Sequence, residues 1–214
     1  RENRGALDEM ILGLSSTDLA LIVIIILGGV TPFFYFRGER INISKMKAFS
    51  KELQEKLNPK DQLYKMLGTL VGFEAVFELK RDHLNKAEAV LILLPRHSVI
   101  YYPFSKLTSK SDKFIFKAMY NENLRISPSA IERKKKFCEN SKIILINGIK
   151  YHACGKDANK LLELISGIDR RMNLVRISYE DKLLFLEFFT NKEEVVKVAI
   201  DIMNKAKEMY LPYT

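Results

Sequence analysis

Residues 17 to 40 read TDLALIVIIILGGVTPFFYFRGER, and this stretch decides how the rest of the chain is organised. Residues 19–36 contain no charge. At about 1.5 Å per helical residue, these eighteen residues span roughly 27 Å, close to the ~30 Å hydrocarbon core of a bilayer. Residues 19–27 are apolar all the way round a helix, so no polar face is left for solvent. The run therefore predicts a membrane anchor.

Two alternatives to an anchor stay open, a cleaved export signal and a buried core helix. A cleaved signal has a short apolar region and a small-residue cleavage site before a polar mature segment. Here the run ends instead in aromatic residues after Pro32, a composition typical of a membrane interface. The residues expected to face lipid are Leu19, Leu21, Ile22, Val23, Ile24, Ile25, Ile26, Leu27, Phe33, Phe34, Tyr35 and Phe36.

The charges on the two flanks predict the orientation of this anchor. Residues 1–18 hold two basic and four acidic residues, a net charge of −2. Residues 37–60 hold seven basic and three acidic residues, a net charge of +4. Because Lys and Arg are retained on the cytoplasmic side, we expect a short extracytoplasmic tail over residues 1–18 and a cytoplasmic C-terminal domain. The predicted location is the cell membrane, with a single pass.

The remaining pattern predicts an α+β domain of antiparallel strands with helices packed on one face. The expected divisions are a transmembrane helix (19–36), a juxtamembrane amphipathic helix and linker (37–60) and the domain itself (61–214), with a further split near residue 140 left open. Strands are expected at 73–80, 87–94, 112–119, 174–177 and 183–189. A hairpin is expected around Asn147-Gly148, whose residue types tolerate the positive φ values of a tight turn.

Helices complete this expected domain. Ser127-Pro128 predicts the start of a basic helix that continues to Cys138, since Ser is a good N-cap and Pro suits the first helical position. A second helix is expected over residues 157–172. Asn191, with Glu194 three residues later, predicts the cap of a final helix. Beyond the anchor, the 214-residue chain is long enough for one compact domain or two small ones.

No motif in the sequence supports an enzyme, a cofactor or a metal site. Gly155-Lys156 resembles the end of a phosphate loop, but that motif needs Gly at 150 and Ser or Thr at 157, where the chain has Lys150 and Asp157. His152 and Cys154 lie two apart on an expected strand and form at most half of a metal site. We expect Cys138 and Cys154 to be reduced and buried, because a cytoplasmic location keeps thiols reduced.

Basic residues are the candidates for contact with a partner. The chain carries a formal charge of +9, which favours anionic lipid, RNA or an acidic protein face, although surplus lysine is also common on solvated surfaces. Four consecutive cations cannot share one face of a helix, so part of the run at 133–136 is expected to be ordinary surface. The candidate contact residues are Arg133, Lys134, Lys135, Lys136, Arg170 and Arg171.

Three stretches resemble the calumin family, coiled-coil-domain proteins of the endoplasmic reticulum. They are SDKFIFKAMYNEN at 111–123, IDRRMNLVRISYED at 168–181 and LLFLEFF at 183–189. The resemblance implies one membrane span, a cytosolic α+β domain, and a role as an accessory factor that binds the SecY-type translocon and its ribosome during membrane-protein insertion, without catalysis. Residues 1–214 contain neither the family's acidic luminal region nor its basic coiled coil, so the expectation is a remote, prokaryotic-type relative. The alternative is a membrane-tethered module that binds anionic lipid or another protein.

Overall fold

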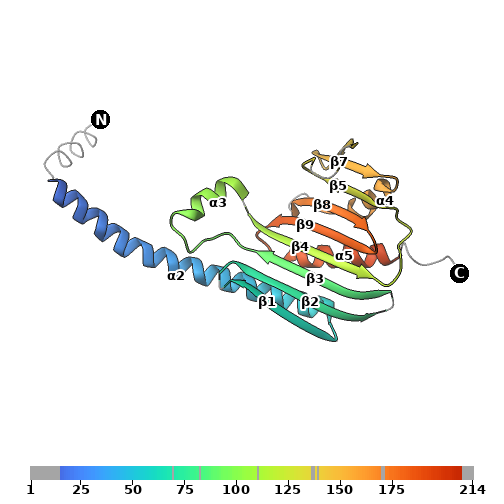
Figure 1. The fold of residues 1–214 in the computed structure, drawn as a ribbon, viewed down its shortest axis with the longest axis horizontal. Helices are drawn as coiled ribbons and strands as arrows, with labels where there is room; N and C mark the ends of the chain where they lie inside the picture. Colours follow the sequence, from blue (N-terminus) through green and yellow to red (C-terminus); the bar gives the residue numbers. More distant parts are fainter. Residues whose placement is uncertain are drawn as a thin grey trace.

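The computed structural model describes residues 15–68, 70–81, 83–109, 111–135, 138, 140–169 and 172–208. A long N-terminal helix leads into a nine-stranded sheet whose neighbouring strands are all antiparallel, in the order β1-β2-β3-β4-β9-β8-β5-β7-β6 (Figure 1). Three further helices complete the described part of the chain. The expected α+β class, with one apolar N-terminal helix, is confirmed.

Helix α2 (Ser16–Leu57) contains both the predicted transmembrane helix and the predicted amphipathic helix. The apolar run and the amphipathic segment form one helix of 42 residues, about 63 Å long at 1.5 Å per residue. Its start is fixed by a capping box between Ser15 and Asp18, and it ends at Asn58, which adopts the left-handed conformation with φ 40°. Pro32 lies inside the helix without ending it. Within the segment 37–60, predicted as an amphipathic helix and linker, the helical backbone continues without a break to Leu57.

The first half of the sheet is a meander. It contains β1 (Asp61–Gly68), β2 (Gly72–Arg81), β3 (Leu84–Ile92) and β4 (Asp112–Tyr120), and α3 (Tyr101–Ser109) lies between the last two strands. Gly72 has φ 145°, and a Cβ there would lie 1.8 Å from the carbonyl oxygen of Leu91, so only glycine fits where β2 begins. The strands expected at 73–80, 87–94 and 112–119 are confirmed. Strand β1 had not been predicted.

The second half adds β5 (Ser129–Glu132), β6 (Lys142–Ile146), β7 (Ile149–Gly155), α4 (Ala158–Ile165), β8 (Leu174–Glu180), β9 (Leu183–Thr190) and α5 (Glu194–Glu208). The Asn147-Gly148 hairpin is confirmed, with φ 50° and 75° at the two turn residues. Strands β4 and β9 pair along their whole length, so both halves of the domain share one sheet.

The basic helix expected from Ser127 to Cys138 is wrong. Residues 129–132 form β5, which is buried and paired on one side with β7 and on the other with β8. Two ladders of backbone hydrogen bonds, available only in the folded domain, outweigh the local preference of Ser127-Pro128 for a helix start. The helix expected over 157–172 is also shorter, and α4 ends at Ile165.

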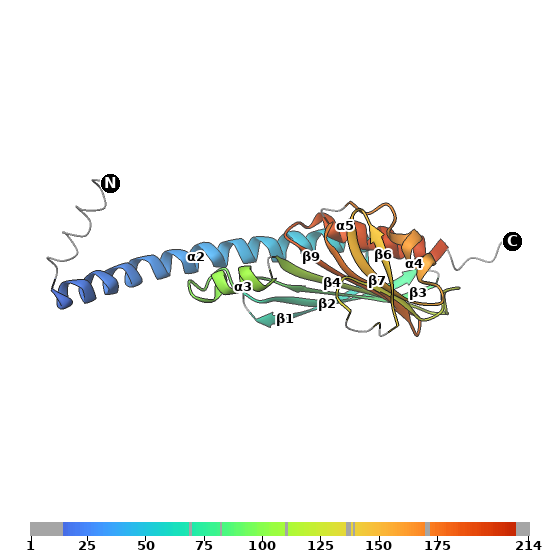
Figure 2. The same cartoon turned by 90° about the horizontal axis from the view of Figure 1, so that it is seen from above.

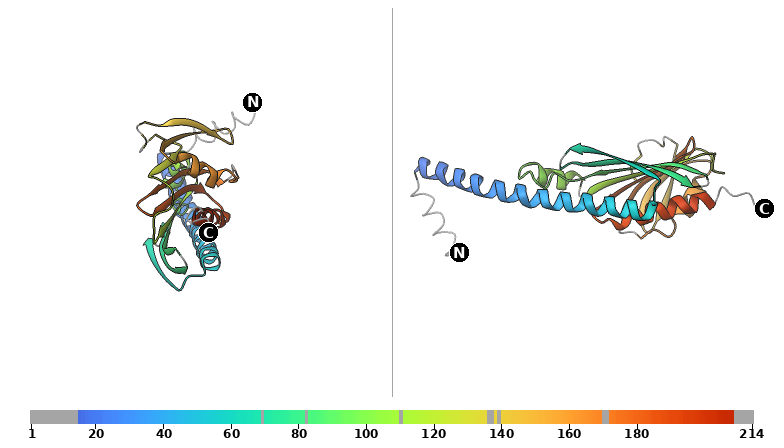
Figure 3. Two further views of the ribbon diagram at one scale, coloured as in Figure 1. Left: turned by 90° about the vertical axis from the view of Figure 1, so that its right-hand side faces the viewer. Right: turned by 90° about the horizontal axis from the view of Figure 1, so that it is seen from below.

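All the helices that cover the sheet lie on one face of it. The C-terminal part of α2 packs beside α5, and α4 lies over β5 and β7 (Figures 2 and 3). The ring of Phe49 in α2 lies 5.6 Å from that of Phe114 in β4, which anchors the helix on the sheet. The core is built from alternate strand residues, among them Phe77, Phe114, Phe116 and Phe188, none of which is exposed.

The opposite face of the sheet carries ion pairs between neighbouring strands. Glu88 accepts from Lys86 at 2.7 Å and from Lys117 at 3.2 Å, and Lys113 pairs with Glu187 at 2.8 Å. The hydrogen bond from Lys86, together with the contribution of Lys117, holds the pKa of Glu88 below its usual value. These pairs link β3 to β4 and β4 to β9 across the opposite face.

Candidate membrane-exit junction

The apolar segment of α2 lies outside the domain. Within the described residues, α2 is the one helix that is long and apolar enough to cross a membrane, and none of its apolar window is buried against the rest of the fold. The side chains of Ile24, Ile25 and Phe33 are 60–67% exposed. A buried core helix would pack these side chains, so the core-helix alternative does not fit the fold of this chain.

The loop between β3 and α3 contacts α2 where the apolar run ends. The ring of His97 lies 5.9 Å from that of Tyr35, edge to face. One turn further on, the backbone of Arg96 and His97 comes so close to Gly38 that a Cβ there would lie 2.3 Å from the carbonyl carbon of Arg96. The absence of a side chain at Gly38 is therefore what allows this contact.

We expect Gly38→Ala to lower the free energy of unfolding by about 1–3 kcal/mol, because the added methyl group overlaps backbone that cannot move aside easily. The measurement is chemical unfolding of the full-length protein in detergent micelles. Gly28→Ala is the matched control, since nothing lies within 4 Å of its Cβ position and alanine favours a helix over glycine. Equal stability of the two variants would contradict the close contact.

Behind this contact, a buried carboxylate joins the helix to the sheet. The Asp112 side chain, which has no exposed surface, accepts from Lys45 Nζ at 2.8 Å and from Arg96 Nη1 and Nη2 at 2.8 and 2.9 Å. The backbone N–H of Leu94 donates to it at 2.9 Å. One carboxylate thus connects α2, the loop that follows β3 and the start of β4.

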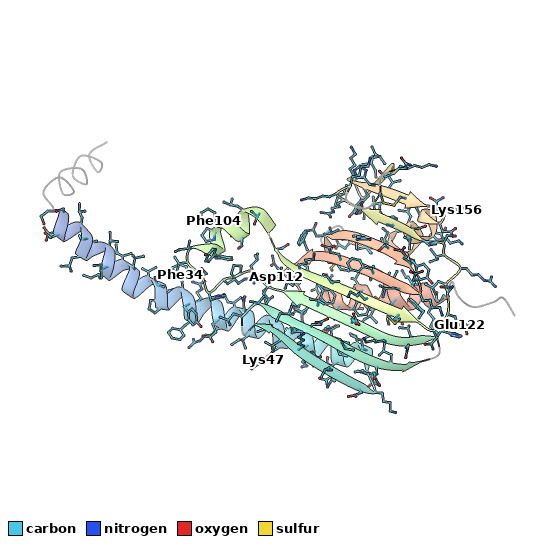
Figure 4. The ribbon with its side chains drawn as sticks, viewed as in Figure 1. Phe34, Lys47, Phe104, Asp112, Glu122 and Lys156 are labelled. Atoms are coloured by element: carbon cyan, nitrogen blue, oxygen red, sulfur yellow. A yellow bond between two sulfur atoms is a disulfide. The ribbon has the colours of Figure 1, made fainter. Side chains whose placement is uncertain are left out.

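Two asparagines extend this cluster. Asn42, fully buried on α2, donates to the carbonyl oxygens of Leu70 and Leu94 at 2.8 and 3.0 Å and accepts from Arg96 at 3.0 Å. Asn191 accepts from Lys45 through its carbonyl at 2.8 Å, and from Arg96 through its side chain at 3.3 Å. We call Asn42, Lys45, Arg96, Asp112 and Asn191 the junction network; Figure 4 labels Asp112 at the end of the sheet nearest the apolar segment.

The junction network is built for positioning. Each buried polar side chain in it has protein partners, as buried polar groups require. Asn191, which was expected to cap α5, uses its side chain here instead, and α5 begins at Glu194. The cluster fixes the angle at which α2 leaves the sheet.

The predicted basic contact residues are only partly placed by the structure. The guanidinium of Arg133 lies 5.5 Å from the centre of the Tyr151 ring, and it donates to the Tyr151 hydroxyl at 3.2 Å and to Asn173. Arg133 is therefore engaged inside the domain, whereas Lys134 and Lys135 are exposed. Lys136, Arg170 and Arg171 lie outside the described residues. The cavity beside Arg133 measures about 20 Å³, room for one water molecule and not for a small-molecule substrate.

The expectation of two reduced cysteines is wrong. Cys138 and Cys154, sixteen residues apart, form a disulfide with their Cα atoms 5.7 Å apart. A disulfide sulfur is not a thiolate, so Cys154 is not available to a metal, and His152 Nδ1 instead lies 3.1 Å from the hydroxyl of Ser141. Across the described part of the chain, no group of three or more His, Cys, Asp or Glu side chains is arranged to hold a metal ion.

Of the junction residues, only Asn191 had been singled out in the sequence, and for a different role, as the cap of the final helix. Asn42 and Asp112 are 70 positions apart, and each is a polar residue of a type that is usually exposed. One signal was present: Asn42 is a polar residue at the spacing of the buried stripe that contains Gly38, Met46 and Phe49. Comparison with known proteins finds no family model that matches the chain and no match among curated proteins.

Proposed function

We propose that this protein is a membrane-anchored adaptor that acts by binding and holds its sheet domain at a fixed height and angle above a bilayer. The observation that carries this proposal is the continuity of α2. One helix runs from the apolar segment into the core, where Phe49, Leu53 and Leu57 are fully buried. The domain therefore cannot swing freely about a linker.

A fixed tether has a specific physical use. It confines the domain to the membrane surface and raises its effective concentration near a membrane-bound partner, provided that the geometry allows both to engage. A flexible linker would leave the orientation of the domain open, whereas the junction network ties α2 to β4 through Asp112. This arrangement suits a protein that presents one surface to a partner in the same membrane.

We propose further that the partner belongs to the machinery that inserts membrane proteins, the SecY-type channel and its ribosome. The support is the resemblance of residues 111–123, 168–181 and 183–189 to the calumin family, and the basic flank at residues 37–60, which favours a cytoplasmic domain. In this proposal Lys134 and Lys135 contribute to contact with ribosomal RNA.

The test is affinity purification of the full-length protein from native membranes in mild detergent, followed by mass spectrometry. We expect channel subunits and ribosomal proteins to be recovered together, and the ribosomal proteins to be lost as salt is raised, because phosphate contacts release counterions. Reversing both charges, Lys134→Glu with Lys135→Glu, is expected to reduce their recovery. The control with the same change in net charge is Lys47→Glu with Lys197→Glu, at two exposed helix positions.

Recovery of neither channel subunits nor ribosomal proteins would reject the insertion role. The anchor is tested separately by extraction of membranes at high pH, from which a spanning protein is not released. Release of the chain under those conditions would reject the adaptor proposal itself.

A further inference from the structure

Helix α3 carries an exposed apolar surface that packs on nothing in the domain. Ile100, Tyr101, Phe104 and Leu107 are 69%, 68%, 65% and 77% exposed. Tyr101, Phe104 and Leu107 lie within one side of α3, because residues three apart are neighbours on a helix surface, and Ile100 immediately precedes the helix. We call these four residues the α3 apolar face. Large apolar side chains gathered in this way mark an interaction site.

The position of α3 identifies its neighbour. The loop that leads into the helix is fixed to α2 by the contact of His97 with Tyr35 and by the close approach at Gly38. Figure 4 labels Phe104 and Phe34 at the same level along the long axis, and Figures 2 and 3 agree that α3 lies beside α2. The α3 apolar face is thus level with the aromatic end of the proposed membrane span.

The charges around this face fit lipid headgroups. Residues 97–111 contain no acidic residue. Lys106 projects from α3, with its amine 6.0 Å from the centre of the Tyr102 ring, and Arg37, Glu39 and Arg40 follow the apolar run of α2 with a net charge of +1. An apolar side next to a basic residue, without acidic residues in the segment, is typical of helices that lie in the plane of a membrane interface.

We infer that α3 is a second membrane contact, which lies in the headgroup region with the α3 apolar face toward the acyl chains. This inference rests on the proposed anchor. It favours lipid over a protein partner because the surface continues the exposed apolar segment of α2 at the same level. A single helix fixes the height of a domain but leaves it free to turn about the helix axis. A second contact beside it removes that rotation, so the domain presents one face in a set direction.

The chain contains no tryptophan, so a single introduced tryptophan reports on its own surroundings. Three full-length variants are reconstituted in vesicles of phosphatidylcholine and phosphatidylglycerol: Leu107→Trp on α3, Leu27→Trp in the apolar segment and Leu145→Trp on β6. The three native leucines are all exposed, at 77%, 57% and 75%. Each variant is measured in ordinary vesicles and in vesicles whose acyl chains carry bromine, a contact quencher of tryptophan.

For Leu107→Trp and Leu27→Trp, we expect tryptophan emission at shorter wavelength and the loss of most of its intensity in brominated vesicles. For Leu145→Trp, we expect the same emission in both kinds of vesicle. Adding Phe104→Asp to Leu107→Trp is expected to restore most of its intensity, since a charge on the apolar face opposes burial. Quenching of Leu27→Trp without quenching of Leu107→Trp would overturn the inference and leave the anchor standing. If neither Leu27→Trp nor Leu107→Trp is quenched, both the anchor and the second membrane contact are rejected. Circular dichroism of each variant shows that the fold is kept.

Discussion

Replacing Asp112 by alanine is expected to lower the free energy of unfolding by about 3–5 kcal/mol, the cost of breaking a buried ion pair by removal of one partner. Asp112 has no exposed surface, and Arg96, which it binds through both oxygens, is only 10% exposed at its side chain. Without the carboxylate, the guanidinium of Arg96 and the amine of Lys45 lose the charge that pairs them in a largely buried site. The backbone N–H of Leu94 also loses its acceptor.

The measurement is urea unfolding of the full-length protein in micelles, followed by the fluorescence of its nine tyrosines. Glu55→Ala is the matched control, since Glu55 pairs with Lys51 at 3.8 Å on the exposed side of α2, and surface pairs contribute about 0–1 kcal/mol. Asp112→Asn keeps the shape of the side chain and one acceptor oxygen but removes the charge. Its decrease in the free energy of unfolding is therefore expected to lie between those of Asp112→Ala and Glu55→Ala. If Asp112→Ala costs no more than Glu55→Ala, the junction network does not hold the helix to the sheet.

A second observable separates a local effect from general destabilisation. In Asp112→Ala the amide proton of Leu94 is expected to exchange faster with solvent, because its hydrogen bond is removed. Amides in the centre of β4 and β9, which pair along their length, are expected to exchange at rates set by the global stability of the domain. Faster exchange confined to the junction would place the damage where α2 leaves the sheet.

The elements with strong local patterns were the ones that the sequence predicted well. The charge-free run at residues 19–36 is unmistakable, and the alternation of Phe114 and Phe116 with Lys113 and Lys117 has the period of a strand with one buried face. Asn147-Gly148 marks its hairpin through backbone conformation alone. Each of these signals is contained within a few neighbouring residues.

The elements that the sequence misplaced depend on distant partners. Strand β5 is four residues long and is buried between β7 and β8, which follow it by more than fifteen residues in the chain. Strand β1 lies at the edge of the sheet and exposes Leu63 and Met66, so its hydrophobic residues do not alternate in the way that a strand with one buried face requires. Local propensity alone could place neither of them.

The junction network was not predicted, for a related reason. Lys45, Arg96 and Asp112 are ordinary surface residue types, and only the tertiary fold brings them within hydrogen-bonding distance. The basic run at 133–136 attracted attention because its residues are consecutive, yet Arg133 is engaged by Tyr151 and Asn173. The consecutive positions of these basic residues in the sequence therefore did not predict a shared basic surface in the fold.

Removal of the disulfide is expected to lower the free energy of unfolding by about 3 kcal/mol, the value for a closed loop of roughly fifteen residues. The cysteines are 16 residues apart, and the bond links β7 to the segment that follows β5. The loss arises because the unfolded chain gains freedom once the loop is open. The variant is Cys138→Ala with Cys154→Ala, compared with the oxidised protein in the same urea titration.

A reducing agent supplies the matched control. It should lower the stability of the unmodified protein to near that of the double variant, and it should leave the double variant unchanged. Mass spectrometry confirms that one sample of the unmodified protein is oxidised and the other reduced. Equal free energies of unfolding for these two samples would contradict a stabilising disulfide. The oxidation state is read by alkylating free thiols before and after reduction.

The same alkylation of free thiols, applied to intact cells, tests on which side of the membrane the domain lies. Two observations on the chain point to opposite sides. The basic flank at residues 37–60 favours a cytoplasmic domain, where thiols are kept reduced, whereas a disulfide is typical of an oxidising compartment. Thiols that are free in cells and bonded after purification would preserve the cytoplasmic orientation and the proposed ribosome contact. A bond already present in cells would place the domain outside the cytoplasm, except in a hyperthermophile, whose intracellular proteins also carry disulfides. The adaptor would then work on the other side of the membrane, on partners that meet it after insertion.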